Sequence, residues 1–179
     1  MTERTAAPEP IWAFTEHEHR ELARGIDLLH EIACGIETWA PPTLPARLGR
    51  ILGWFDSVLD PHLRWEEASL YPEIDSRTGT PWATRSARFD HQQIREAATR
   101  VRGDRSRLLL DSQAFAAAET RCHLFVLEAL LRSHIEREER FLVPIVAEPA
   151  APRVPEPAAA PVEKAVPSSL DEPIPTEFA

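Results

Sequence analysis

Lysine, cysteine and long apolar runs are scarce in this chain of 179 residues, which contains one lysine and two cysteines. The formal net charge is −9 and no dense basic cluster occurs, which argues against a nucleic acid or an anionic membrane surface as a partner. No run of about 18 apolar residues is present, which argues against a membrane-spanning helix. The first ten residues, MTERTAAPEP, lack the basic start and apolar stretch of a signal peptide. We therefore expect a cytoplasmic protein.

The two cysteines, Cys34 and Cys122, stand in no metal-binding or redox spacing. We expect them to be reduced and buried as small apolar residues, not joined in a disulfide. His30 and His123 each lie 11 residues from another histidine that the repeat described below singles out. We expect this pair to be buried and bonded to each other or to the backbone.

The composition changes near residue 148, and the segment from there to residue 179 carries 8 of the 17 prolines and no tryptophan. Such a segment cannot form a packed core, so we expect residues 148–179 to be a disordered tail, and residues 1–10 a disordered N-terminus. The end of the tail, residues 165–179, contains Leu170, Ile174 and Phe178 spaced by prolines that oppose a helix. It fits an extended docking peptide for a protein partner. The layout resembles that of cargo proteins held inside bacterial protein shells, which makes such a shell one candidate partner.

One segment occurs twice in the chain. Residues 62–72 read HLRWEEASLYP and residues 134–144 read HIEREERFLVP, with the histidine, both glutamates, a leucine and the proline at the same offsets. The same period of 72 residues relates His19 in HEHREL to His91 in DHQQI. The repeat is therefore a whole helical hairpin, and it suits two structural halves of one domain.

Four segments between residues 11 and 147 show apolar residues at alternating steps of three and four, the spacing of a buried helical face. The first helix starts after Pro10 and ends at APPTLP, the second stops near Pro72, the third starts at Pro81, and the fourth opens near Asp111. The expected buried faces include Val58, Ser69 and Phe141. Short turns between helices of similar length predict an all-α, up-down-up-down four-helix bundle over residues 11–147.

Histidines and glutamates occupy positions on these faces where a leucine would otherwise lie. The residues concerned are His19, His62, Glu66, His91, His134 and Glu138. Burying imidazoles and carboxylates costs several kcal/mol unless a partner compensates them. Four imidazoles and two carboxylates at one level of a bundle suit two metal ions bridged by carboxylates. The donor types favour iron, with manganese or zinc as alternatives.

These four motifs resemble the ligand motifs of the hemerythrin, or HHE cation-binding, family, over roughly residues 11–147. The resemblance implies a four-helix bundle with a non-haem di-iron centre. By position it implies that His19 and His62 hold one iron, that His91 and His134 hold the other, and that Glu66 and Glu138 bridge them.

The motifs depart from those of oxygen-carrying hemerythrins in two places. Those proteins carry a further histidine one turn after the first on the third helix, where this chain has Arg95. They also place the last carboxylate five residues after its histidine, at Glu139 here, whereas the internal repeat favours Glu138. One imidazole fewer implies an additional open position at the metals, which disfavours reversible oxygen carriage.

We expect a di-iron protein that binds or reacts with oxygen, peroxide or nitric oxide, in protection against oxidative or nitrosative stress. Turnover as an oxidoreductase is left open. The alternative is an iron reservoir or an iron- or oxygen-sensing protein without turnover. Near the first motif, Tyr71 is expected either to donate a hydrogen bond to a metal-bound ligand or to cap the core, and Glu67 to orient metal ligands.

Overall fold

The structure is a computed structural model, and it describes residues 10–39, 43–111 and 116–148. The described residues form helices and turns, with no strand among them. α1 spans Ile11–Gly35 and α5 spans Trp82–Leu110. The rod between them joins α2 (Leu44–Trp54), the π-helix η2 (Phe55–Leu59), α3 (Asp60–Trp65), the π-helix η3 (Glu66–Leu70) and α4 (Tyr71–Thr78). The last rod joins α6 (Ala117–Arg137), the π-helix η4 (Glu138–Leu142) and α7 (Val143–Ala147).

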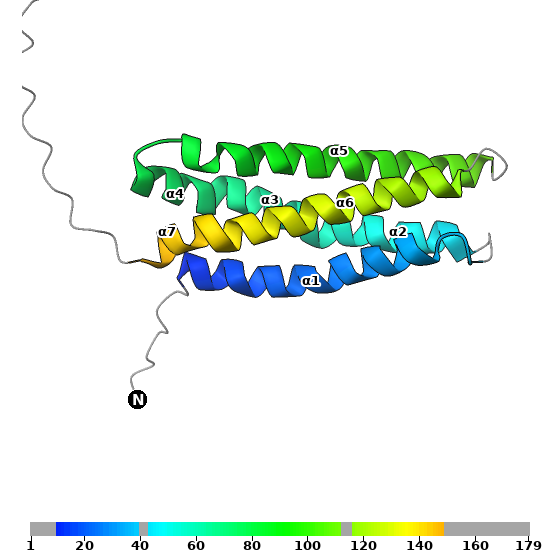
Figure 1. Ribbon diagram of the computed structural model, residues 1–179, viewed down its shortest axis with the longest axis horizontal. Coiled ribbons are helices and arrows are strands. Elements are labelled where there is room, and N and C mark those ends of the chain that lie inside the picture. The colour runs from blue at the N-terminus through cyan, green and yellow to red at the C-terminus, as the bar shows by residue number, and fades with distance from the viewer. Residues whose placement is uncertain (1–9, 40–42, 112–115, 149–179) are drawn as a thin grey trace, which may run out of the picture.

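Figure 1 shows the four rods side by side, with successive rods running in opposite directions. The all-helical bundle predicted from the sequence is therefore present. None of the helices among the described residues has the length and apolar character needed to cross a membrane. The predictions for residues 1–10 and 148–179, including the docking peptide at 165–179, fall outside the described residues except at Pro10 and Glu148.

Three prolines lie in the interior of the rods, directly after a π-helix. Pro61, Pro72 and Pro144 all occupy the second residue of the α-helix that comes directly after the π-helix. Proline lacks an N–H and crowds the carbonyl four residues before it, so it normally ends or kinks a helix. The wider π-turn interrupts the regular hydrogen-bond ladder at that place and lets the rod continue. The predicted end near Pro72 is therefore wrong, because the rod runs on to Thr78 and ends at Gly79 with a left-handed φ of 69°.

The π-turns also shift which residues face the core. Three predicted core positions are wrong, namely Val58, Ser69 and Phe141. The next residue along is buried in each case: Leu59, Leu70 and Leu142. A π-turn takes up one residue more than an α-turn, so the buried face moves by one position. As a result Phe141 is 60 % exposed.

Two apolar clusters enclose the level of the histidines. The larger cluster includes Leu22 on α1, Leu63 on α3 and Leu131 on α6. The smaller cluster, toward the other end, includes Leu70, Ala87 and Leu142. On every rod the repeated histidines lie between residues of the two clusters, so the polar layer has apolar packing on both sides.

Candidate metal centre

The six predicted ligand residues are buried, and the bundle brings them together. Their relative exposure is 0–3 %. His19, His62 and Glu66 each offer a ligand atom within 4.8 Å of the others. A second group with the same property contains Glu66, His91, His134 and Glu138. Glu66 belongs to both groups, as a bridging carboxylate would.

The inner nitrogen, Nε2, of the histidines lies close to the two glutamates. His62 Nε2 is 2.9 Å from Glu66 Oε1, and His91 Nε2 is 3.2 Å from Glu66 Oε2. His19 Nε2 is 3.3 Å from Glu138 Oε2, and His134 Nε2 is 3.7 Å from the same oxygen. Each glutamate thus faces histidines from both halves of the repeat.

Several atoms of this cluster are buried without a hydrogen bond. Within the described parts of the chain, both ring nitrogens of His62 and of His134 have no hydrogen-bond partner, nor do Glu66 Oε2 and Glu138 Oε2. Buried polar atoms without partners are costly, and their occurrence in a native fold calls for an explanation such as a bound ion. Imidazole nitrogen and carboxylate oxygen are the donors that iron, manganese and zinc accept. The residues present therefore fit a metal centre.

The protonation of the cluster depends on the balance between burial and close charges. Burial by itself lowers the pKa of His19, but the close carboxylates of Glu138 and Glu66 outweigh burial and raise that pKa to about 9. Burial acts in the same way on His134, where contacts with Asp90 and Glu66 raise the pKa to about 10. In the absence of metal, protons on the imidazoles thus offset the buried carboxylates.

The two central glutamates differ. Burial favours the neutral form of Glu66, but the attraction of the surrounding imidazoles, that of His134 first among them, holds its pKa well below the usual range. The pKa of Glu138 is raised, because the group is buried and faces the charge of Glu66. A divalent ion between the two carboxylates would remove this repulsion.

Carboxylates also face the outer nitrogen, Nδ1, of the histidines. His91 Nδ1 is 2.7 Å from Glu67 Oε1, and His19 Nδ1 is 3.3 Å from Glu139 Oε1. Glu67 and Glu139 are 72 residues apart, so the repeat places them at equivalent positions. Such contacts fix the orientation and tautomer of a ligating imidazole. This is the role expected of Glu67 from the sequence.

A second equivalent pair faces the other two histidines. His62 Nδ1 is 3.9 Å from Glu18 Oε2, and His134 Nδ1 is 3.8 Å from Asp90 Oδ2. The sequence analysis missed this pair. An acidic residue immediately precedes both His19 and His91, and its recurrence at the period of 72 was the available signal.

Glu138 and Glu139, the two candidates for the second bridging carboxylate, differ in how deeply they are buried and in which histidine nitrogen they face. Glu138 is fully buried and lies beside the Nε2 atoms of His19 and His134, whereas the Glu139 side chain is 51 % exposed. Glu139 contacts the outer nitrogen of His19. This placement favours Glu138 as the bridging residue.

Arg95 occupies the position at which oxygen-carrying hemerythrins have a further histidine. Its guanidinium donates to Glu67 Oε1 at 2.8 Å and to Asp60 Oδ1 at 2.9 Å. Burial by itself raises the pKa of Glu67, but hydrogen bonds with Arg95 and His91 outweigh burial. The pKa is therefore lowered overall, and the carboxylate stays charged. Arg95 therefore fixes the position of Glu67, which in turn contacts the outer nitrogen of His91. No contact of Arg95 with an inner ligand atom is found among the described residues.

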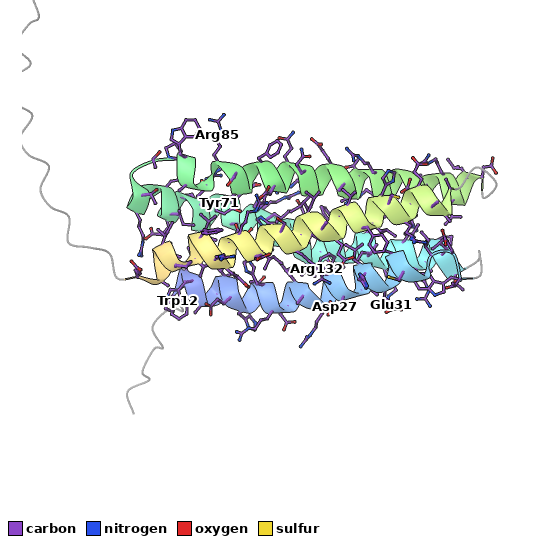
Figure 2. The ribbon with its side chains drawn as sticks, viewed as in Figure 1. Trp12, Asp27, Glu31, Tyr71, Arg85 and Arg132 are labelled. Atoms are coloured by element: carbon purple, nitrogen blue, oxygen red, sulfur yellow. The ribbon has the colours of Figure 1, made fainter. Side chains whose placement is uncertain are left out.

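Tyr71 lies inside the cluster, toward the same end of the bundle as Trp12 (Figure 2). Its side chain is fully buried and belongs to the smaller apolar cluster. The hydroxyl donates to Glu138 Oε1 at 2.5 Å and lies 2.7 Å from His91 Nε2. Burial and the charge of Glu138 raise the pKa of Tyr71, so the phenol remains a hydrogen-bond donor. Tyr71 thus packs in the core and also donates a hydrogen bond to a predicted metal ligand.

The polar residues away from the centre differ from expectation. Cys34 and Cys122 are exposed, not buried, because they fall on outward positions of α1 and α6. His30 and His123 do not bond to each other. His30 Nδ1 is 2.9 Å from Glu128, and His123 Nδ1 is 2.7 Å from Asp104.

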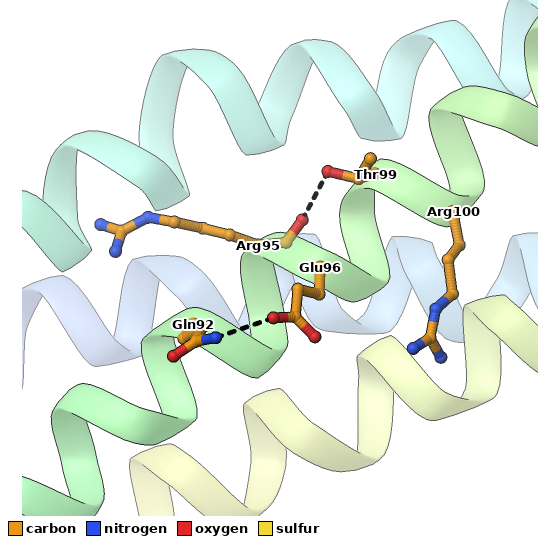
Figure 3. Close-up of a pocket in the computed structure, with 5 residues that line it drawn as sticks. All are labelled: Gln92, Arg95, Glu96, Thr99 and Arg100. Atoms are coloured by element: carbon orange, nitrogen blue, oxygen red, sulfur yellow. Dashed lines mark hydrogen bonds between the residues drawn. The ribbon is translucent and has the colours of Figure 1, made fainter.

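A hollow on the surface of α5 is separate from the ligand atoms. It has a volume of about 490 Å³ and is lined by Gln92, Arg95, Glu96, Thr99 and Arg100. Figure 3 shows the Arg95 side chain leaving it in one direction and the Arg100 side chain in another, while Gln92 donates to Glu96. No predicted metal ligand lines this hollow.

The comparisons with known proteins identify the family. The model of the hemerythrin HHE cation binding domain matches residues 11–146, which are most of the chain and include all six clustered residues. No curated protein and no solved structure gives a significant match. With a match of this extent, the chain belongs to the hemerythrin HHE cation-binding domain family.

Proposed function

We propose that this chain is a non-haem di-iron protein that binds or reacts with oxygen, peroxide or nitric oxide. The observation that carries the proposal is the pair of buried ligand groups that share Glu66 and leave inner donor atoms without hydrogen bonds. A surface cluster of acids and histidines would have none of this burial. The family match adds that the domain is a cation-binding domain.

His19 and His62 are proposed to hold one iron, and His91 and His134 the other. Glu66 and Glu138 are proposed to lie between the two ions. Bound iron supplies the capacity to bind and exchange electrons with small oxygen- or nitrogen-containing molecules. The imidazole and carboxylate donors also suit manganese and zinc, so the metal itself has to be measured.

The remaining residues near the centre set its surroundings. The apolar clusters on both sides keep bulk water away and strengthen electrostatic interactions inside. Arg95 takes the place of a ligating histidine and bonds to Glu67, so the His91 side has one imidazole fewer than an oxygen carrier. The Tyr71 hydroxyl, which donates to Glu138, offers a hydrogen bond at the centre. These features favour reaction over reversible carriage.

The proposal is tested by metal analysis of the purified protein together with its visible absorption spectrum. We expect about two iron ions per chain and a spectrum that changes on adding peroxide or nitric oxide. Iron bound with no spectral change for any of the three small molecules would favour the alternative, a reservoir or sensor without turnover. Absence of a stoichiometric metal would overturn the proposal.

A docking role for residues 165–179 is proposed on the sequence alone, with a bacterial protein shell as one candidate partner. The test joins these residues to an unrelated fluorescent protein and isolates the fusion from the native host. Specific recovery of one partner, absent with the unfused fluorescent protein, is expected. Recovery of nothing beyond the control would remove the docking role.

A further inference from the structure

A cavity of about 260 Å³ adjoins the second ligand group. It lies between α5 and η4, and its lining includes Ala83, Ser86, Ala87, Phe141, His134 and Glu138. Ser86 and Phe141 are exposed, whereas His134 and Glu138 are buried. The cavity therefore reaches from the surface of the bundle to two predicted metal ligands.

Small side chains and a π-turn produce this hollow. Ala83, Ser86 and Ala87 are spaced by three and four residues, so they share one face of α5. None of them is large enough to fill the space opposite η4. The π-turn directs Leu142 inward and leaves Phe141 at the rim, where it is 60 % exposed.

The other half of the repeat supplies an internal comparison, because its equivalent positions hold larger side chains. The residues 72 positions before Ala83, Ser86 and Ala87 are Ile11, Phe14 and Thr15. The Phe14 ring packs on Trp65 with 4.5 Å between centroids, and Trp65 is the equivalent of Arg137. The space beside the first ligand group is thus occupied by aromatic rings.

An ion pair lies beside the open space instead of those rings. Arg137 pairs with Asp90, and both residues line the cavity. The Arg137 side chain is 42 % exposed, so it can move without breaking the core. A neutral pair of charges gives the opening no strong preference for either sign of ligand.

We propose that this cavity is the route by which the small ligand reaches the metal centre, on the side of His134 and Glu138 instead of that of His19 and His62. The inference rests on the proposed function and adds where the ligand enters. A volume of about 260 Å³ exceeds the ~30 Å³ share of one water molecule several-fold. The cavity therefore has room for a molecule of two to four atoms.

The test measures access without redox chemistry. The full chain is loaded with cobalt(II), whose visible bands report ligand binding, and mixed rapidly with azide. In Ser86→Phe the cavity receives the side chain that the other half of the repeat carries at this position. We expect an unchanged cobalt content and azide binding that is about tenfold slower or more, a barrier increase of about 1.4 kcal/mol.

Three further variants make the result decisive. Ser106→Phe makes the same change at an exposed site on α5 far from the cavity, and we expect it to bind azide at the rate of the unaltered protein. Ala83→Ile copies Ile11 and serves as a second plug if Ser86→Phe loses metal. Phe141→Ala widens the rim and should bind azide at least as fast as the unaltered protein.

The outcomes separate the route from the function. Plugged variants that bind cobalt and take up azide as fast as Ser106→Phe overturn the route while leaving the metal centre in place. Slower binding by Phe141→Ala also contradicts it. Failure of the unaltered protein to bind any divalent ion overturns the proposed function, and the route with it.

Discussion

The two halves of the candidate metal centre lie on the two copies of one repeated hairpin, yet their surroundings differ. In both halves a histidine from one rod and a histidine from the next face Glu66, and a carboxylate faces each outer nitrogen. The half with His91 and His134 has three additional polar residues: Tyr71, Arg95 and Arg137. At the equivalent positions the half with His19 and His62 has Val143, Ala23 and Trp65.

This difference affects how firmly each half is held before metal binds. His91 Nδ1 is 2.7 Å from a carboxylate that Arg95 also binds, whereas His19 Nδ1 is 3.3 Å from Glu139, which is half exposed. Ligands already fixed by outer contacts lose less conformational freedom on binding an ion. We therefore expect the position at His91 and His134 to bind metal more tightly than the position at His19 and His62.

The change with the largest expected effect removes the residue common to both halves. Glu66→Ala takes a carboxylate from each ligand group, so we expect both ions to be lost. Glu138→Ala should abolish the paired site as well. Metal analysis of the purified variants measures the effect directly.

Glu139→Ala is the matched control for these variants. Glu139 contacts only the outer nitrogen of His19 among the clustered histidines for which a contact is described, and its side chain is half exposed. The variant should still bind both ions, although more weakly, because it loses an outer contact and no inner ligand atom. Loss of metal from Glu139→Ala, with retention in Glu138→Ala, would show that the bridging role belongs to Glu139.

The next effect concerns pH and tests both halves together. In the metal-free protein the pKa of His19 is raised to about 9 and that of His134 to about 10. The native state thus binds these protons more tightly than the unfolded chain, so this stabilisation is complete below about pH 6.5 and is lost as pH rises through 9 to 10. A bound ion would take the place of the protons on Nε2. The metal-loaded protein should therefore not lose stability in this way as the pH rises.

Thermal unfolding followed by circular dichroism, with and without chelator, measures this effect. We expect the chelated protein to melt at a lower temperature than the loaded protein, with a gap that widens from pH 6.5 to pH 10. Equal melting temperatures would contradict the stabilisation by metal. A chelated protein that gains stability over this range would contradict the raised pKa values.

A smaller effect separates the two halves. Arg95→Met releases Glu67 and leaves the inner ligands untouched. Removing outer contacts of this kind typically costs about 10- to 100-fold in metal affinity. When a chelator removes the iron, we expect a fast phase, in which the ion at His19 and His62 leaves, and a slow phase, in which the ion at His91 and His134 leaves. Arg95→Met should accelerate the slow phase.

Arg100→Met makes the same substitution on α5, at a side chain that points elsewhere in the same hollow (Figure 3). This control should leave both phases unchanged. A single phase in the unaltered protein, or equal effects of the two substitutions, would show that the halves hold metal alike.

The repeat explains why the inner residues could be predicted from the sequence. Histidine and glutamate at His62, Glu66, His134 and Glu138 recur at a fixed period on core-facing positions, and helical geometry then places them at one level. The contact of Arg95 with Glu67 and those of Tyr71 with Glu138 and His91 could not be derived in this way. They depend on side-chain directions across neighbouring rods, which spacing along one helix does not determine.

The π-turns were the other feature that the sequence did not show. A regular α-helical period places Phe141 inward, because the extra residue in η4 leaves no mark on the apolar pattern before it. The sequence analysis takes Pro72 as a helix end and draws no boundary from the prolines at 61 and 144. In the structure each follows a π-turn, and the recurrence of two of them at the period of 72 was the usable signal.

The smallest expected effect comes from restoring the missing arginine to the first half. Ala23 is the equivalent of Arg95, is exposed, and lies one turn after His19, so Ala23→Arg places a guanidinium near Glu139. The equivalent of Asp60 there is Arg132, so the new arginine would have one carboxylate partner, not two. An exposed ion pair contributes about 0.2–1 kcal/mol, so the fast phase of iron loss should slow by at most about fivefold, and not at high salt. Ala23→Arg could instead slow the fast phase by the same factor by which Arg95→Met accelerates the slow phase. That result would show that outer arginines alone account for the difference between the halves. The packing of Phe14 on Trp65 would then have no part in it.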